Sequence, residues 1–103
     1  MQMHQIRYFL AICAELNFTR AARRCGVSQP SLTAAIGTLE QNLGGALFCR
    51  KPSVALTALG HALHPYLEQI AEDAEHAREV ARASIDARAA PAISDQADDA
   101  IAR

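Results

Sequence analysis

The stretch NFTRAARRCGVSQPSL, residues 17–32, decides the fold. Asn17 precedes a short helical stretch and supplies a side-chain oxygen suited to an N-cap. Gly26 stands where a left-handed backbone ends that helix. Ser28 caps the next helix, and Pro30 falls in its first turn, where a missing backbone N–H costs nothing. Two helices joined by a tight turn that contains glycine are typical of the helix-turn-helix motif.

The helix that Ser28 opens has a single apolar stripe, which recurs at the spacing of a buried helix face. The stripe consists of Leu32, Ile36, Leu39 and Leu43. Gly44 and Gly45 are expected to end this helix. An earlier segment, from His4 to Leu16, has the same one-faced pattern and predicts a first helix.

Two short apolar runs follow, residues 46–50 and 54–56, on either side of Lys51-Pro52-Ser53. Their length and the turn residues between them predict a small β-hairpin with a basic tip. Thr57 then caps a long helix that Pro91 is expected to end. The predicted fold class is mainly α: a winged helix-turn-helix of three helices and a hairpin wing, followed by a long dimerisation helix.

This pattern divides the chain into three parts. We expect a winged helix-turn-helix domain over residues 1–57, a linker or dimerisation helix over 58–90 and a disordered acidic tail over 91–103. The 103 residues carry a net charge of −1, but the balance is +4 in residues 1–57 and −5 in residues 58–103. A basic front half predicts a polyanionic partner for that end.

The three cysteines form no C-x-x-C pair, which indicates reduced thiols in a cytoplasmic protein. We expect neither a signal peptide nor a membrane span, because the apolar run around residues 8–14 is short and ends at Glu15. His61, His64 and Glu68 have a spacing that could hold a metal ion, but no second element supplies a further ligand. Metal, cofactor and catalytic residues are therefore all predicted to be absent.

The second helix of a helix-turn-helix enters the major groove of DNA. The polar residues of the helix that Ser28 caps therefore predict how bases would be read. Gln29 both donates and accepts hydrogen bonds, which matches the major-groove edge of adenine. The ring of Pro30 suits a thymine methyl group, and Thr33 has a hydroxyl for a base or a phosphate. Ala34 and Gly37 share this open face, because they lie about 140–200° around the helix axis from the stripe, and their small side chains supply shape only.

Other polar residues are expected to contact phosphates. Asn17, Thr19 and Ser28 lie near helix N-termini, which attract anions. Arg50 and Lys51 on the hairpin would reach a neighbouring minor groove or its phosphates. Taken alone, Arg20, Arg23 and Arg24 are better explained as a solvated helix face. Beside the recognition motif Arg20 is assigned to the DNA backbone, whereas Arg23 and Arg24 fit either interpretation.

These motifs resemble the N-terminal domain of LysR-type transcriptional regulators. The residues that carry the resemblance include Arg7-Tyr8-Phe9, Asn17 to Ala22, Val27 to Thr33, Ile36, Leu39-Glu40, Leu43-Gly44, Leu47-Phe48, Arg50, Leu56-Thr57 and Gly60. The resemblance implies double-stranded DNA as partner, with base contacts at Gln29, Pro30 and Thr33. It implies backbone contacts at Thr19, Ser28 and Ser31, and a wing contact at Arg50.

The resemblance also implies that the long helix joins two copies of the chain. At 1.5 Å per residue this helix would extend about 50 Å, beyond the reach of a small head domain, so its apolar stripe calls for a partner helix. The predicted dimerisation residues are Leu59, Leu63, Tyr66, Leu67, Ile70, Ala74, Ala77 and Val80. The family's effector-binding domain is expected to be absent from this chain, so a dimerising fragment that modulates full-length relatives is the alternative function.

Overall fold

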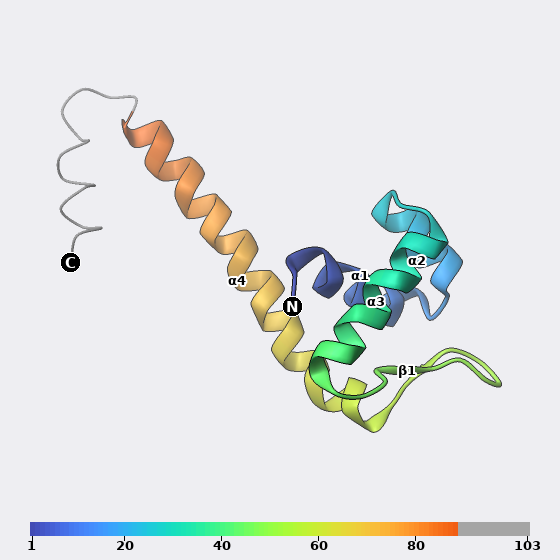
Figure 1. Cartoon of the computed structure of the whole chain (residues 1–103). Coiled ribbons are helices and arrows are strands. Elements are labelled where there is room, and N and C mark those ends of the chain that lie inside the picture. Colours follow the sequence, from blue (N-terminus) through green and yellow to red (C-terminus); the bar gives the residue numbers. More distant parts are fainter. Residues whose placement is uncertain (89–103) are drawn as a thin grey trace. The chain divides into compact units, whose positions relative to one another are not determined.

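Six regular elements occupy residues 1–88, the part of the chain that the computed structural model describes (Figure 1). They are α1 (Met3–Glu15), α2 (Phe18–Cys25), α3 (Gln29–Leu43), β1 (Phe48–Cys49), β2 (Ala55–Leu56) and α4 (Ala58–Arg88). The predicted fold class, with three helices, a hairpin wing and a long helix, is confirmed. The expected end of the long helix at Pro91 and the acidic tail lie outside the described residues.

Side-chain caps begin three of the helices. The Asn17 amide oxygen accepts the backbone N–H three residues further on in α2, at 2.7 Å. The Ser28 hydroxyl accepts the equivalent N–H in α3 at 3.2 Å, and Thr57 does the same for α4 at 3.0 Å. Each contact satisfies a backbone donor that has no partner inside the helix, and each was predicted from the sequence.

Left-handed residues end the first three helices. Gly26 and Gly44 have φ values of 72° and 88°, so glycine suits both positions. Leu16 ends α1 with φ of 49°, which is unusual for a residue with a side chain. The sharp turn at Leu16 leads directly to Asn17, the residue that caps α2.

The core lies where α1, α2 and α3 pack on one another and on the base of the hairpin. Ala21 and Ala22 are buried at the α2 contact, where their small side chains permit a close approach of the helices. The largest fully buried side chains are Phe9, Ile6, Ile12, Leu32, Ile36, Leu39 and Leu47. The stripe predicted for the third helix is therefore buried at its first three positions, while Leu43 packs against the edge of the core.

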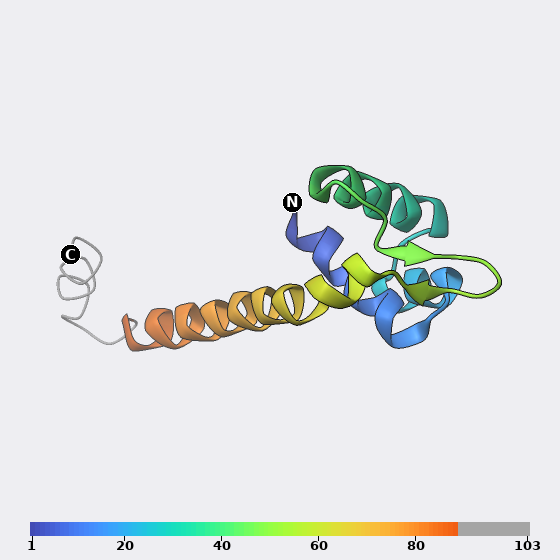
Figure 2. The same cartoon turned by 90° about the horizontal axis from the view of Figure 1, so that it is seen from below.

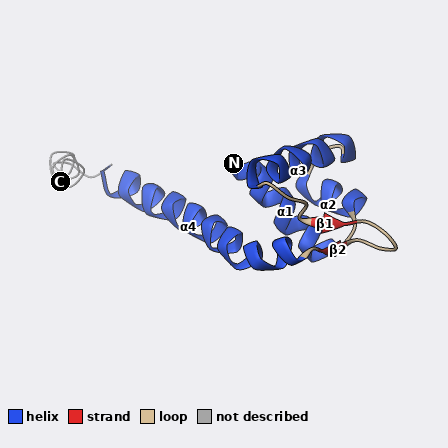
Figure 3. Ribbon diagram, turned by 60° about the horizontal axis from the view of Figure 1, so that its bottom comes forward, coloured by secondary structure: helices blue, strands red, loops and turns tan. Residues whose placement is uncertain are grey.

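The hairpin is a two-stranded antiparallel sheet, and the loop that connects its strands extends away from the helices (Figures 2 and 3). Phe48 pairs with Leu56, and Cys49 pairs with Ala55. The start of the wing is held by the Glu40 carboxylate of α3, which accepts the backbone N–H of Leu47 at 2.7 Å. This contact spans seven residues of sequence and was not predicted.

The long helix α4 contributes to two compact units, and its first turns belong to the head. The first unit runs from Met1 to Ala71, so it extends beyond the boundary expected at residue 57. The physical reason is packing: Leu67 is 2% exposed, and Leu59 and Leu63 pack against the same core. No helix within residues 1–88 is long and apolar enough to cross a bilayer.

Pro65 lies inside α4, which was not predicted. Proline lacks a backbone N–H and crowds the preceding turn, so it normally weakens a helix interior. The packing of Leu63 and Leu67 against the head domain flanks this weak point. The first turns of α4 are thus stabilised by tertiary contacts rather than by helix propensity.

Candidate nucleic-acid interface

The first turn of α3 exposes two of the three residues that were predicted to read bases, together with Ser31, which was predicted to contact the DNA backbone. Gln29, Pro30 and Ser31 are all exposed, and Ala34 is exposed one turn later. Leu32 between them is fully buried and fixes the rotation of the helix on the core. The exposed face of α3 is therefore narrow, with polar side chains at its start and the small Ala34 after them.

Thr33 lies differently from the expectation. The residue is only half-buried, but its hydroxyl oxygen is inaccessible to solvent and has no hydrogen-bond partner within the described residues. The expectation that this hydroxyl lies on the open face is wrong for this structure. The physical reason is that Thr33 lies only about 100° around the helix axis from the buried stripe. It therefore stands at the border between the buried and the exposed faces of α3.

Two serines at the start of α3 have different roles: Ser28 caps the helix, and Ser31 has a donor for a phosphate. The Ser28 hydroxyl accepts the Ser31 backbone N–H and donates its own proton to the Ser31 hydroxyl oxygen at 2.9 Å. Ser28 is thereby occupied in both directions. Ser31 accepts from Ser28, which leaves its own hydroxyl proton available for an anion. Ser31 is the better phosphate donor of the two.

The N-terminus of α2 presents Thr19 and Arg20 on the surface, both exposed. The Asn17 amide oxygen is committed to the cap, so only its N–H groups remain for a phosphate. Glu15, at the end of α1, lies 3.5 Å from Arg20 and 3.1 Å from Arg24. These distances separate charged side-chain atoms, so one carboxylate offsets part of the positive charge of two arginines.

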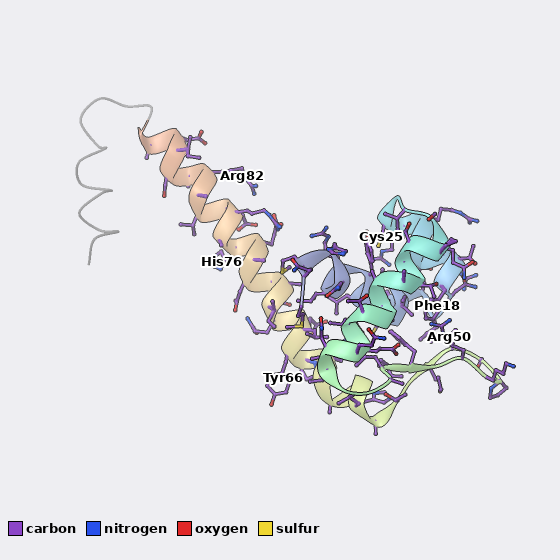
Figure 4. The ribbon with its side chains drawn as sticks, viewed as in Figure 1. Phe18, Cys25, Arg50, Tyr66, His76 and Arg82 are labelled. Atoms are coloured by element: carbon purple, nitrogen blue, oxygen red, sulfur yellow. The ribbon has the colours of Figure 1, made fainter. Side chains whose placement is uncertain are left out.

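The wing places Arg50 over the ring of Phe18, the first residue of α2 (Figure 4). The guanidinium carbon lies 4.3 Å from the ring centroid, which is a cation–π contact. Lys51 follows on the exposed loop. The structure therefore brings the predicted wing residue to the N-terminus of α2, a contact that joins residues far apart in the sequence.

The residues predicted for dimerisation fall into two groups. Leu67 is buried in its own head domain, and Leu59 and Leu63 pack there as well. The prediction that these leucines face a partner is therefore wrong for Leu67, whose side chain has no surface left to offer.

The remaining apolar residues of α4 are open. Tyr66 is 69% exposed and Ile70 37%, and Figure 4 shows Tyr66 projecting from the helix. Val80 and Ile85 further along are 58% and 65% exposed. Ala77 is exposed and Ala74 is half-buried. An exposed apolar series of this kind is typical of a helix that pairs with another.

The remaining titratable side chains of residues 1–88 do not gather into a metal site. No cluster of three or more metal-ligating side chains occurs within residues 1–88. His61 is exposed, and the ring of His64 lies 6.1 Å from that of Phe9, which is a packing contact. Burial raises the pKa of the Cys13 thiol to about 11, so this cysteine is protonated at neutral pH.

The chain matches the family described as "Bacterial regulatory helix-turn-helix protein, lysR family" over residues 3–61. It is 45% identical over 83 residues to the Hca operon transcriptional activator HcaR of Escherichia coli, covering 80% of this chain and 28% of HcaR. It is 46% identical over 68 residues to the HTH-type transcriptional regulator IlvR of Caulobacter vibrioides, covering 65% of this chain and 23% of IlvR. The chain thus spans about a quarter of the length of these relatives.

Solved structures with the same fold include complexes with DNA. The structure of a CbnR DBD–DNA complex matches with a TM-score of 0.76 and 36% identity, covering 82% of this chain and 99% of that chain. The structure of a BenM DBD bound to catB site 1 DNA matches with a TM-score of 0.75 and 30% identity, covering 80% of this chain and 92% of that chain.

Proposed function

Because the chain belongs to the lysR family of bacterial regulatory helix-turn-helix proteins, we propose that it is a sequence-specific DNA-binding transcriptional regulator that acts as a homodimer. The observation that carries this proposal is the exposed first turn of α3, where Gln29 and Pro30 stand beside the free hydroxyl proton of Ser31. We place the protein in the bacterial cytoplasm, where its DNA target lies, and assign it no enzymatic activity and no cofactor.

In this proposal the first turn of α3 enters the major groove. Gln29 pairs with the N6 and N7 edge of an adenine, and Pro30 contacts a thymine methyl group. Ala34 and Gly37 let the helix approach the bases closely but add no hydrogen bonds. Thr33 takes part only if its side chain rotates, because its hydroxyl is buried in the structure without DNA.

Phosphate contacts come from two sides of this helix. Ser31 and the N–H groups of Asn17 donate from the helix-turn-helix, together with the exposed side chains of Thr19 and Arg20. Ser28 contributes mainly by capping α3. Arg50 and Lys51 donate from the wing. Contacts of this type supply affinity and register but carry no sequence information.

The homodimer is proposed to form through the exposed apolar residues of α4. Tyr66, Ile70, Ala77 and Val80 are the residues we assign to it, with a smaller share for the half-buried Ala74. A dimer binds two half-sites with related sequences, so the affinity of a single narrow reading face is multiplied.

The proposal is tested by the base preference of a Gln29→Ala variant. Selection from a randomised duplex library should yield a two-fold related site for the wild type. In the variant, discrimination should fall by about 1–3 kcal/mol at one position of each half-site. Gln41→Ala is the matched control, because Gln41 is an exposed glutamine near the far end of α3 and should leave the preference unchanged.

Two outcomes would contradict the proposal. If the wild type selects no sequence, the protein is not a sequence reader. If Gln29→Ala retains the full preference of the wild type, base reading does not depend on the first turn of α3. The affinity should also fall steeply with salt, because phosphate binding releases counterions from the DNA.

A second candidate function is that of a dimerising fragment that modulates longer relatives. It is favoured by the exposed apolar residues of α4, which would pair with the matching segment of a relative such as HcaR. Mixing the chain with a full-length relative and resolving the mixture by size-exclusion chromatography tests this. A mixed species supports modulation, and the absence of one at micromolar concentrations excludes it.

A further inference from the structure

We infer that Phe18 is a positioning residue for DNA binding: its ring holds the Arg50 guanidinium at the N-terminus of α2, with its N–H groups directed outward to a phosphate. This inference rests on the proposed function, because it assumes that the wing meets DNA. Phe18 was not among the predicted DNA contacts, and its role explains how a short, open wing presents an ordered cation.

The ring of Phe18 is itself held firmly. Phe18 is only 7% exposed. Its ring packs against that of Phe48 in β1 at 5.8 Å between centroids, with the planes at 77°. Phe48 in turn packs against Phe9 of α1 at 5.3 Å. Arg50 therefore contacts an aromatic cluster that is part of the buried core, and not an exposed side chain.

The contact with Phe18 leaves the hydrogen-bond donors of Arg50 available. A guanidinium carries five N–H donors fixed in one plane, so a contact with a single aromatic ring leaves donors for another partner. Within residues 1–88 no hydrogen bond or ion pair occupies these donors. Arg20 and Arg24 differ, because Glu15 engages both. Arg50 is thus a cation with its orientation set and its donors free.

The place of the contact also suits an anion. Phe18 is the first residue of α2, next to the exposed Thr19. Figure 4 shows Phe18 and Arg50 side by side at this end of the helix. A phosphate that meets Arg50 here would also lie near the positive end of the α2 dipole. The Phe18 ring therefore joins the wing to the N-terminus of α2, two elements that would otherwise contact the DNA backbone independently.

The inference is tested by a double-mutant cycle between Phe18 and Arg50. The variants are Phe18→Leu, Arg50→Ala and the double substitution, with Phe18→Tyr as the control that retains the ring. The probe is a mixed-sequence B-DNA duplex, since phosphate contacts do not depend on sequence. The dissociation constant is measured over a range of salt concentrations, and thermal unfolding checks that each variant is folded.

Arg50→Ala should weaken binding and lower the slope of log K against log salt by about 0.9. Phe18→Leu should weaken binding about two- to fivefold, the ratio expected for loss of an exposed cation–π contact. Phe18→Tyr should bind like the wild type. Phe18→Leu should have no effect once Arg50 is replaced, which a general packing defect would not produce.

The results separate this inference from the proposed function. If Phe18→Leu weakens binding equally with and without Arg50, the positioning role is overturned while the DNA contact of Arg50 stands. If Arg50→Ala leaves the affinity and the salt slope unchanged, the wing contact and the inference both fail. The base preference of Gln29→Ala still reports separately on DNA reading.

A measurement on the wild type keeps the inference testable if Phe18→Leu does not fold. Protons of the Arg50 side chain should show an upfield ring-current shift in the NMR spectrum of the DNA-free protein. The shift should persist in Phe18→Tyr. Ordinary random-coil shifts for Arg50 would overturn the inference.

Discussion

The α carbon of Gly60, in the first turn of α4, lies so close to the backbone of Leu47 that a methyl group at Gly60 would overlap the Leu47 carbonyl oxygen. The Leu56 side chain lies against the same point. The Leu47 carbonyl also accepts the backbone N–H of Thr57 at 2.9 Å. The wing and the start of α4 are therefore joined by a backbone contact that only glycine permits.

Gly60→Ala is expected to destabilise the protein by about 1–3 kcal/mol, the usual cost of overpacking a close contact. The backbone of Leu47 cannot move aside without loss of its hydrogen bond to Thr57. Urea unfolding followed by circular dichroism measures this free energy.

Gly37→Ala is the matched control for that variant. Gly37 lies in the interior of α3 with an ordinary helical backbone, and no heavy atom lies within 4 Å of the position that an added methyl group would take. The same substitution there should stabilise the protein by roughly 0.5–1 kcal/mol. Equal effects at Gly60 and Gly37 would contradict the packing described for the wing.

Glu15→Gln is expected to strengthen binding to mixed-sequence DNA. The carboxylate lies within 3.5 Å of both Arg20 and Arg24, so its loss frees two cations on the surface of α2. The slope of log K against log salt should become steeper by about 0.9 for each arginine that then reaches a phosphate. Fluorescence anisotropy at several salt concentrations measures the slope.

Glu75→Gln controls for the general effect of removing an acid. Glu75 in α4 pairs with Arg78 at 3.2 Å and with Arg82 at 3.7 Å, so it has the same chemistry outside the proposed interface. We expect a smaller effect on the slope. If the two variants behave alike, only the net charge matters, and α2 has no special part in binding DNA.

Thr33→Val is expected to stabilise the fold and to weaken DNA binding. Valine has the shape of threonine but removes a buried hydroxyl that has no partner within the described residues, and an unpaired buried polar group costs about 1–3 kcal/mol. A hydroxyl kept at such a cost is explained if DNA supplies its partner after a side-chain rotation. Thermal unfolding and a gel shift on the selected site test both effects, and unchanged binding would remove Thr33 from the interface.

The three cysteines should react with maleimide at different rates. Cys49 on the wing is exposed and should be labelled first at about neutral pH. Cys13 should be labelled last, because burial disfavours its thiolate and raises its pKa from 9.0 to about 11. Its rate should increase only as the pH rises toward that value. Mass spectrometry of digested protein measures the order, and early labelling of Cys13 at neutral pH would contradict its burial.

The sequence was sufficient for the local features. The caps at Asn17 and Ser28 and the helix ends at Gly26 and Gly44 were all predicted, because each depends on hydrogen bonds or backbone angles within a few residues. Leu32 and its stripe were predicted for a similar reason, since helical periodicity places them on one face. The local sequence therefore determines the helix-turn-helix and the exposure of the first turn of α3.

Only the tertiary structure decided which side chains remain available to a partner. Periodicity treats all apolar residues of α4 alike, but the head domain buries Leu67 and leaves Tyr66 open. Spacing around α3 placed Thr33 on the open face, whereas packing buries its hydroxyl. Phe18 and Arg50 meet because the base of the wing packs against α2. Such contacts join distant residues, and their geometry depends on how the whole core packs rather than on any local pattern.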